Sequence, residues 1–240
     1  MKMSPTKIAV FDIDGTIFRS SLVIELSHAL VERGIFPQAA KKEISREYLA
    51  WVDRKGTYEA YINKVVKIYI KHIGGKDFNK VKKVAQTVIS YQKDRVYRFT
   101  RDLIKELKSQ KYFLVAISGS PSYIVEAYAK AIGFDLFFGT QLEVAGGKFT
   151  GRPINLDSAY DKSKIVKALL KKYPSIDAKK SVAVGDTEGD IAVLSLVGNA
   201  IAFNPNNNLA RVAVKKGWRI VAERKDVIFD IKKFNFLNSK

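Results

Sequence analysis

Short apolar runs recur at the N-terminal end and in the second half of the chain. They have the length and continuity of strands that are buried on both faces of a sheet. The four runs span residues 8–13, 112–118, 181–185 and 200–203. Helical patterns follow the later runs, at residues 122–132, 162–173, 190–196 and 209–216. This alternation predicts the α/β fold class, with a doubly wound parallel sheet.

Residues 20–92 show a different pattern, with helical periodicity and few strand signals. Several glycines and Pro37 interrupt this periodicity and divide the segment into about four predicted helices. The segment lies between the first strand and the rest of the sheet. We therefore expect residues 19–96 to form a helical insert in a core made of residues 1–18 and 97–240.

A small β-hairpin is predicted at residues 136–153. Gly146 and Gly147 stand at its centre, where two adjacent glycines favour a tight turn between two strands.

Composition excludes several classes of site. The chain has no cysteine, which excludes disulfides, zinc–thiolate sites and cysteine nucleophiles. With only two histidines, the chain is poorly suited to a histidine-rich metal site or a Ser-His-Asp triad. No apolar run approaches the length of a membrane span, and the N-terminal residues lack the apolar stretch of a signal peptide. We expect a cytoplasmic protein with no membrane partner.

The chain is strongly basic, with 42 Lys and Arg against 24 Asp and Glu and a formal net charge of +18. Such a charge attracts polyanions. However, the basic residues are spread along the chain, and no recognisable RNA- or DNA-binding motif interleaves them with aromatic residues. We interpret the charge as a solvated surface, and nucleic-acid binding stays a less favoured alternative.

Candidate chemistry first appears where the first predicted strand ends, at Asp12-Ile13-Asp14-Gly15-Thr16. Strand alternation would place the two carboxylates on the same side, at the edge of the sheet where such folds bind ligands. Carboxylates held this close repel unless a proton or a cation lies between them. Mg²⁺ suits this site, since it binds carboxylates, water and substrate phosphates through oxygen.

Three later segments would bring further polar groups to the same edge. They are Ser118-Gly119-Ser120 after the second predicted strand, Lys162 at a helix start, and the acidic turn at 185–190 after the third. Hydroxyls and backbone amides at a helix N-terminus are suited to phosphate oxygens. Each segment alone is also compatible with an ordinary turn or helix cap, but their order and placement together indicate one phosphate site.

The sequence resembles the haloacid dehalogenase superfamily, in the branch that is similar to phosphoserine phosphatases and carries a helical cap after the first motif. Four segments match the family's motifs in order: residues 12–16, Ser118-Gly119, Lys162, and residues 185–190. The resemblance covers nearly the whole chain. It implies a Rossmann-like core, with the helical insert as the cap.

The resemblance also implies a phosphomonoester hydrolase that acts on a small phosphorylated metabolite. Asp12 would attack phosphorus and form an aspartyl-phosphate. Asp14 would protonate the leaving oxygen and then activate the water that cleaves this intermediate. The cofactor would be Mg²⁺, held by Asp12, the Asp14 backbone carbonyl and Asp186. An acid at position 14 argues against the ion-pump branch, in which the phosphorylated aspartate must persist.

The remaining motif residues would hold the phosphoryl group. Ser118, the Gly119 amide and Lys162 would bind its oxygens. Asp190 would support Asp186 or Lys162 from behind the site.

Departures from the family pattern bear on the substrate. Phosphoserine phosphatases carry a glutamate nine residues after the nucleophile, where this chain has Ser21. Glu25 lies one helical turn further on and could meet a substrate ammonium instead. Arg46 and Arg54 are candidates for binding a substrate carboxylate. An uncharged alcohol is the favoured leaving group.

Two other functions stay open at this stage. One is a phosphotransferase or phosphomutase on the same fold, in which a hydroxyl replaces water. The other is a basic polyanion-binding protein without catalysis. The sequence does not specify the substrate or the oligomeric state.

Overall fold

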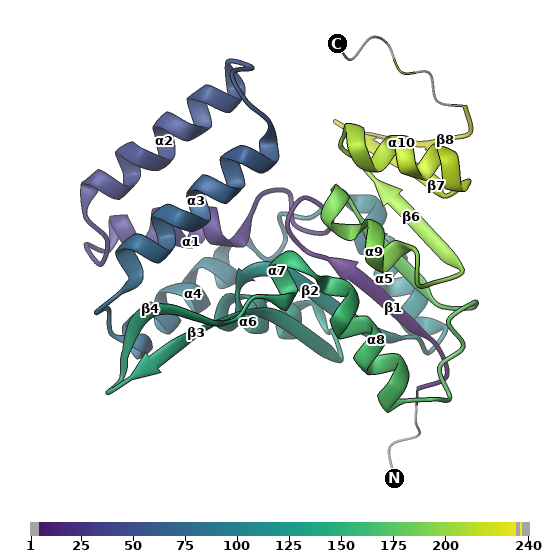
Figure 1. The fold of residues 1–240 in the computed structure, drawn as a ribbon, viewed down its shortest axis with the longest axis horizontal. Helices are drawn as coiled ribbons and strands as arrows, with labels where there is room; N and C mark the ends of the chain where they lie inside the picture. Colours follow the sequence, from purple (N-terminus) through teal and green to yellow (C-terminus); the bar gives the residue numbers. More distant parts are fainter. Residues whose placement is uncertain (1–4, 234–235, 237–240) are drawn as a thin grey trace.

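A mixed eight-stranded sheet forms the centre of the protein in a computed structural model that describes residues 5–233 and 236 (Figure 1). Along the sheet the strands are β4 (Lys148–Asn155), β3 (Leu136–Ala145), β2 (Phe113–Pro121), β1 (Ile8–Asp12), β5 (Val182–Gly185), β6 (Asn199–Phe203), β7 (Arg219–Arg224) and β8 (Val227–Ile231). The six strands from β3 to β7 are parallel, whereas β4 and β8 run antiparallel at the two edges. The predicted α/β fold class is confirmed.

Helices cover both faces of the sheet because successive strand residues point to opposite sides. In β1, Ala9 and Phe11 pack into the core shared with α5 (Arg98–Ser109) and α6 (Ser122–Ile132). Ile8 and Val10 pack into the opposite core, with α8 (Lys162–Lys172), α9 (Ile191–Leu194) and α10 (Asn207–Lys216). Fully buried strands explain why the apolar runs are continuous rather than alternating.

The segment between β1 and β2 contains the helices α1 (Leu22–Glu32), α2 (Gln38–Val52), α3 (Tyr58–Ile73) and α4 (Phe78–Gln92), which precede α5. Figure 1 shows α2 and α3 extending away from the sheet, with α4 lying near α6. The aromatic rings of Phe78 in α4 and Tyr123 in α6 are in edge contact. The insert therefore shares one continuous apolar core with this face of the sheet.

Local signals explain where α3 and α4 begin. Thr57 and Asp77 are their N-cap residues, and each side chain accepts a hydrogen bond from a backbone amide three residues later. Such a cap contributes about 1 kcal/mol to helix stability. The loop between the two helices is also bonded to the hairpin, since the Gly75 amide donates to the Phe149 carbonyl at 2.7 Å.

The hairpin of β3 and β4 forms as predicted, with Gly146 and Gly147 at positive φ between the strands. Two other boundaries differ from prediction. β2 continues to Pro121, which pairs with Thr140 beyond a bulge. The helix predicted at 190–196 is a 3₁₀ turn, Glu188–Asp190, followed by the short α9.

Some elements have no counterpart in the sequence prediction. They are α5, the short α7 (Asp157–Tyr160), β7 and β8. Within the described part of the chain, no helix combines the length and the apolar character needed to cross a membrane. The cytoplasmic location stays a prediction.

Candidate active site

The loop after β1 begins the site. β1 ends at Asp12, and the chain then turns through Gly15, whose φ is +81°. A Cβ at Gly15 would lie 2.3 Å from Asp186 Oδ2, so only glycine lets this loop approach the β5 loop so closely. Thr16 Oγ1 donates a hydrogen bond to Asp186 Oδ1 at 3.0 Å. The two loops are thus held against each other at the carboxyl edge of the sheet.

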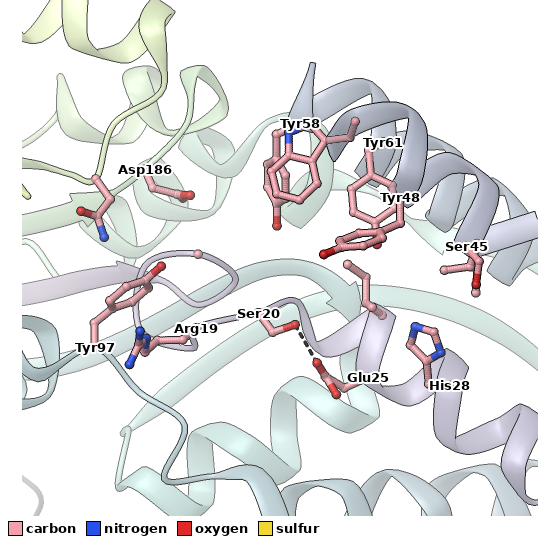
Figure 2. A pocket seen from close by; sticks show the side chains of 15 residues that line it. Arg19, Ser20, Glu25, His28, Ser45, Tyr48, Tyr58, Tyr61, Tyr97 and Asp186 are labelled. Atoms are coloured by element: carbon pink, nitrogen blue, oxygen red, sulfur yellow. Dashed lines mark hydrogen bonds between the residues drawn. The ribbon is translucent and has the colours of Figure 1, made fainter. Parts of the chain in front are cut away.

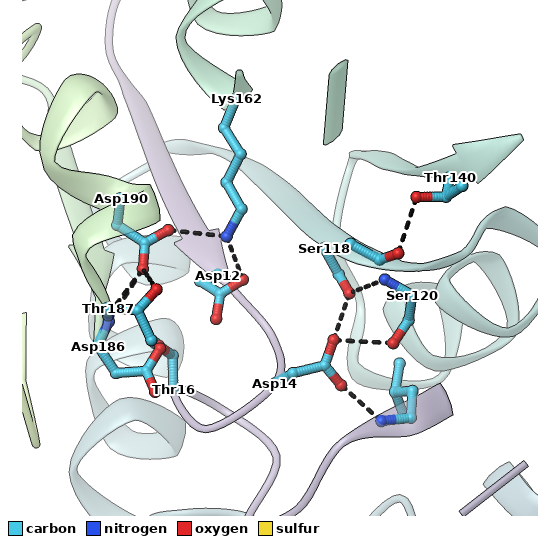
Figure 3. A network of polar contacts seen from close by, with 12 residues as sticks. Asp12, Asp14, Thr16, Ser118, Ser120, Thr140, Lys162, Asp186, Thr187 and Asp190 are labelled. Atoms are coloured by element: carbon cyan, nitrogen blue, oxygen red, sulfur yellow. Dashed lines mark hydrogen bonds and ion pairs between the residues drawn. The ribbon is translucent and has the colours of Figure 1, made fainter. Parts of the chain in front are cut away.

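Lys162 joins the site from the first turn of α8. Its Nζ lies 2.5 Å from Asp12 Oδ1 and 2.7 Å from Asp190 Oδ1, as Figure 3 shows. The Lys162 side chain is only 11% exposed, and both carboxylates are buried, so these are buried ion pairs. Burial alone would lower the pKa of Lys162, but the two carboxylates raise it above its ordinary value and keep the ammonium charged.

Asp190 binds both Lys162 and the backbone of the loop after β5. Its Oδ2 accepts hydrogen bonds from the backbone amides of Asp186 and Thr187 at 3.1 and 3.2 Å. With Oδ1 on Lys162 and Oδ2 on the backbone, both oxygens of Asp190 are engaged. Asp190 therefore positions its neighbours.

Three buried carboxylates gather at one point. One oxygen each from Asp12, Asp186 and Asp190 lie within 4.8 Å of one another. Burial, opposed by Lys162, raises the pKa of Asp12 to about 7. Burial and the neighbouring charge of Asp12 raise the pKa of Asp186 well above its usual range.

The charges at this cluster fit a divalent cation. When ionised, the three carboxylates carry three negative charges, and the Lys162 ammonium balances one of them. The donors are all carboxylate oxygens, which suit Mg²⁺. Asp12 and Asp186 are the members best able to bind it, since both oxygens of Asp190 already have partners.

Asp14 faces a different part of the site. Its Oδ2 accepts hydrogen bonds from the hydroxyls of Ser118 and Ser120, and its Oδ1 accepts one from the Leu22 amide at 2.5 Å (Figure 3). β1 ends at Asp12, and Asp14 lies beyond the strand in the loop that follows. Asp14 is thereby separated from the carboxylate cluster and lies beside the end of β2.

A cavity of about 380 Å³ opens over these groups. The lining residues from the catalytic edge include Asp12, Asp14, Gly119, Lys162 and Asp186. Helix α3 forms the facing wall, and the segment after β4 closes one side. The structure therefore brings residues from all four sequence segments to one cavity, which we call the catalytic cavity.

A second cavity of about 670 Å³ lies beside it and shares Tyr58 and Asp186 with the catalytic cavity. Figure 2 shows aromatic side chains of α2 and α3, including Tyr48 and Tyr61, on one side of this space. Glu25 lines this second cavity, where it accepts a hydrogen bond from Ser20 at 2.7 Å. Arg95 also pairs with Glu25, at 3.1 Å.

The other candidates for substrate selection lie at different places. Ser21 is buried and lines the catalytic cavity. Arg46 is largely exposed and pairs with Glu47 in its own helix. Arg54 is exposed in the turn after α2, at a φ of +61°. Neither arginine is among the residues that line the two cavities.

Sequence reasoning gave no role of their own to several residues of the site. Ser120 binds Asp14 and also accepts a hydrogen bond from the Val23 amide at 3.1 Å. Thr16 holds Asp186, although the motif that contains it was recognised. The face of α3 that covers the cavity was signalled by apolar residues at every fourth position, beginning at Tyr58.

A family model supplies the decisive comparison, because the model of haloacid dehalogenase-like hydrolases matches residues 9–195. The chain belongs to the haloacid dehalogenase-like hydrolase family. The four motifs predicted from the sequence lie within the matched region. The predicted superfamily is therefore confirmed.

Curated relatives include phosphoserine phosphatases of two archaea. The chain is 25% identical to the protein of Archaeoglobus fulgidus over 208 residues, which cover 86% of this chain and 55% of that protein. It is 25% identical to the protein of Methanocaldococcus jannaschii over 224 residues, 92% of this chain and 94% of that protein. These relatives confirm the predicted branch and the class of enzyme.

Solved structures share the fold. A protein of unknown function from Bordetella pertussis Tohama I superposes with a TM-score of 0.73 at 17% identity, covering 90% of this chain and 98% of that one. A structure described as a phospho-aspartyl intermediate analogue of phosphoserine phosphatase gives a TM-score of 0.63 at 23% identity, covering 92% and 95%. At these identities the likeness establishes the architecture alone.

Proposed function

We propose that the protein is a magnesium-dependent phosphomonoester hydrolase that acts on a small phosphorylated metabolite through an aspartyl-phosphate. The observation that carries the proposal is the pairing of Asp12 with Lys162 beside Asp186, in the lining of a cavity that Asp14 also lines. A carboxylate nucleophile needs a positive environment to approach a phosphate dianion, and Lys162 provides one.

Asp12 and Asp14 divide the chemistry between them. An Asp12 oxygen attacks phosphorus and displaces the alcohol, while Asp14 donates a proton to the leaving oxygen. Water then attacks the phosphorus of the aspartyl-phosphate, and Asp14 accepts the proton of that water. The bond between phosphorus and the Asp12 oxygen breaks, which releases phosphate and restores the Asp12 carboxylate. Asp14 and Ser118 already share a hydrogen bond, so substrate binding must redirect the Ser118 hydroxyl to a phosphoryl oxygen.

The other site residues bind the charged phosphoryl group and position the ammonium of Lys162. Ser118, the Gly119 amide and Lys162 bind phosphoryl oxygens, and Asp190 keeps the ammonium of Lys162 over Asp12. Asp12, Asp186 and the Asp14 carbonyl would hold Mg²⁺, which would neutralise charge on the phosphoryl group. We further propose that residues 19–96 act as the cap of a core that comprises residues 1–18 and 97–240.

The first test is Mg²⁺-dependent release of phosphate from a generic aryl phosphate by the purified protein. We expect phosphate release that is abolished by EDTA and restored by added Mg²⁺. A protein that binds polyanions but releases no phosphate would contradict it. Transfer of the phosphoryl group to an added alcohol in preference to water would favour a phosphotransferase instead.

A further inference from the structure

An apolar stripe of α3 faces the catalytic residues. Tyr58, Ile62, Val66 and Ile70 recur every fourth residue, which places them along one side of the helix. All four line the catalytic cavity, and all four are half-buried rather than fully buried. Part of their apolar surface is therefore left to face a ligand instead of the protein core.

The apolar surface continues around the cavity. Val23 of α1 lines the same cavity, as do Pro153 of β4 and Leu156 just after that strand. Tyr58 also lines the second cavity, together with Tyr48 and Trp51. A leaving group that extends beyond the phosphoryl position thus contacts apolar side chains on several sides, next to the polar Asn63 and Lys67 of α3, with aromatic rings further along.

The cavity is poorly equipped for an ammonium group. Ser21, where the family branch has an acid, is uncharged and buried. Glu25 lies in the second cavity and is paired with Arg95. Among the described residues that line the catalytic cavity, Glu59 is the one acid outside the catalytic loops, and it is hydrogen-bonded to Glu188. An amino-alcohol would lose hydration there without gaining a free carboxylate.

We propose that the preferred substrates are phosphomonoesters of apolar alcohols, alkyl or aryl, whose carbon skeleton lies along this stripe of α3. This inference rests on the proposed phosphatase function and specifies its substrate class. The cavity volume of about 380 Å³ is sufficient for such a small ester. Binding of the apolar part would be driven by its removal from water.

A homologous series of primary alkyl phosphates, from methyl to hexyl, tests the proposal with Mg²⁺ present. Each methylene that is buried should raise kcat/KM by about twofold to fourfold. Hexyl phosphate should therefore exceed methyl phosphate by at least about thirtyfold. Phenyl phosphate should also exceed methyl phosphate, and phosphoserine should fall below propyl phosphate.

Two variants of α3 test whether the dependence on alkyl chain length arises from the apolar stripe. Val66→Ser places a hydroxyl in the stripe and should lower the hexyl-to-methyl ratio of kcat/KM several-fold. Lys64→Met changes a residue of the same helix that pairs with Glu47 at 2.6 Å and does not line the catalytic cavity. This control should keep the wild-type ratio. A circular-dichroism melt checks that both variants are folded.

The possible outcomes distinguish failure of the apolar-alcohol proposal from failure of the proposed phosphatase function. Mg²⁺-dependent hydrolysis with no dependence on chain length, or with phosphoserine preferred to hexyl phosphate, would overturn the apolar-alcohol proposal and leave the phosphatase function in place. An unchanged ratio in Val66→Ser would also overturn it. Failure to hydrolyse any ester would instead overturn the proposed function.

Discussion

Single residues account for the close approach of the two acidic loops. Gly15 combines a positive φ with a position at which a Cβ would collide with Asp186 Oδ2. Thr16 and Asp190 fix the same Asp186 from its side chain and its backbone. The geometry of the proposed magnesium ligands therefore depends on residues that do not themselves bind the metal.

Gly15→Ala should weaken Mg²⁺ binding as well as the fold. Adopting this φ costs a non-glycine residue on the order of 1–3 kcal/mol, and the new methyl must also displace Asp186. We expect Mg²⁺ affinity, measured by isothermal titration calorimetry, to fall at least about tenfold. Gly147→Ala in the hairpin turn is the matched control, because it has a similar φ of +75° but nothing within 4 Å of its Cβ. Equal losses of affinity in both variants would show that strain alone is responsible.

At the scale of elements, strands whose faces are both buried were the easiest to predict. β1 and β5 contain little but apolar residues and are covered on both sides, so their sequences carry a clear signal. β8 has an almost fully exposed burial pattern and is held mainly by its ladder with β7, so its sequence carries little signal. The sequence pattern of a single segment does not show which other strand that segment pairs with.

The site residues could likewise be predicted where they adjoin elements with a clear sequence pattern. Asp12, Asp186 and Lys162 were found because they stand at the ends of strongly patterned elements. The orientation of Asp14 could not be found in this way, since it depends on how the loop after β1 meets the end of β2. Likewise, the pairing of Glu25 with Arg95, which is distant in sequence, could not be found from a local pattern.

Ser120→Ala tests the contact between β2 and the loop that carries Asp14. The Ser120 hydroxyl donates to Asp14 at 2.9 Å and accepts from the Val23 amide of α1. Its loss should leave Asp14 less well oriented, and we expect kcat to fall about tenfold with a smaller change in KM. Ser195→Ala removes a hydroxyl that bonds only within its own helix region and should retain wild-type kcat. An unchanged kcat in Ser120→Ala would mean that this contact does not orient Asp14.

At the scale of the whole molecule, metal binding and folding should be linked through pH. In the metal-free protein the pKa of Asp12 is raised to about 7 by burial, whereas in the unfolded chain this carboxyl has its ordinary pKa of 3.8. The folded state then binds more protons between these values, so metal-free stability should fall as pH rises from about 4 to about 7. Asp186, whose pKa is also raised by burial, acts in the same direction.

Mg²⁺ should reverse this loss because it binds the ionised carboxylates of the folded protein. We expect Mg²⁺ at millimolar concentration to raise the Tm more at about pH 8 than at about pH 5.5. Asp186→Ala should remove most of the rise. A Tm that does not respond to Mg²⁺ at either pH would count against the metal site.

The central claim is that Asp12 becomes covalently phosphorylated. The most direct measurement is mass spectrometry of the acid-quenched protein after mixing with substrate and Mg²⁺. In Asp14→Asn, where water activation is lost, we predict a phosphoryl group on the peptide that contains Asp12. In Asp12→Asn we predict neither the adduct nor turnover, since the amide lacks the nucleophilic carboxylate. Turnover of the Asp12→Asn protein at the wild-type rate would contradict the account.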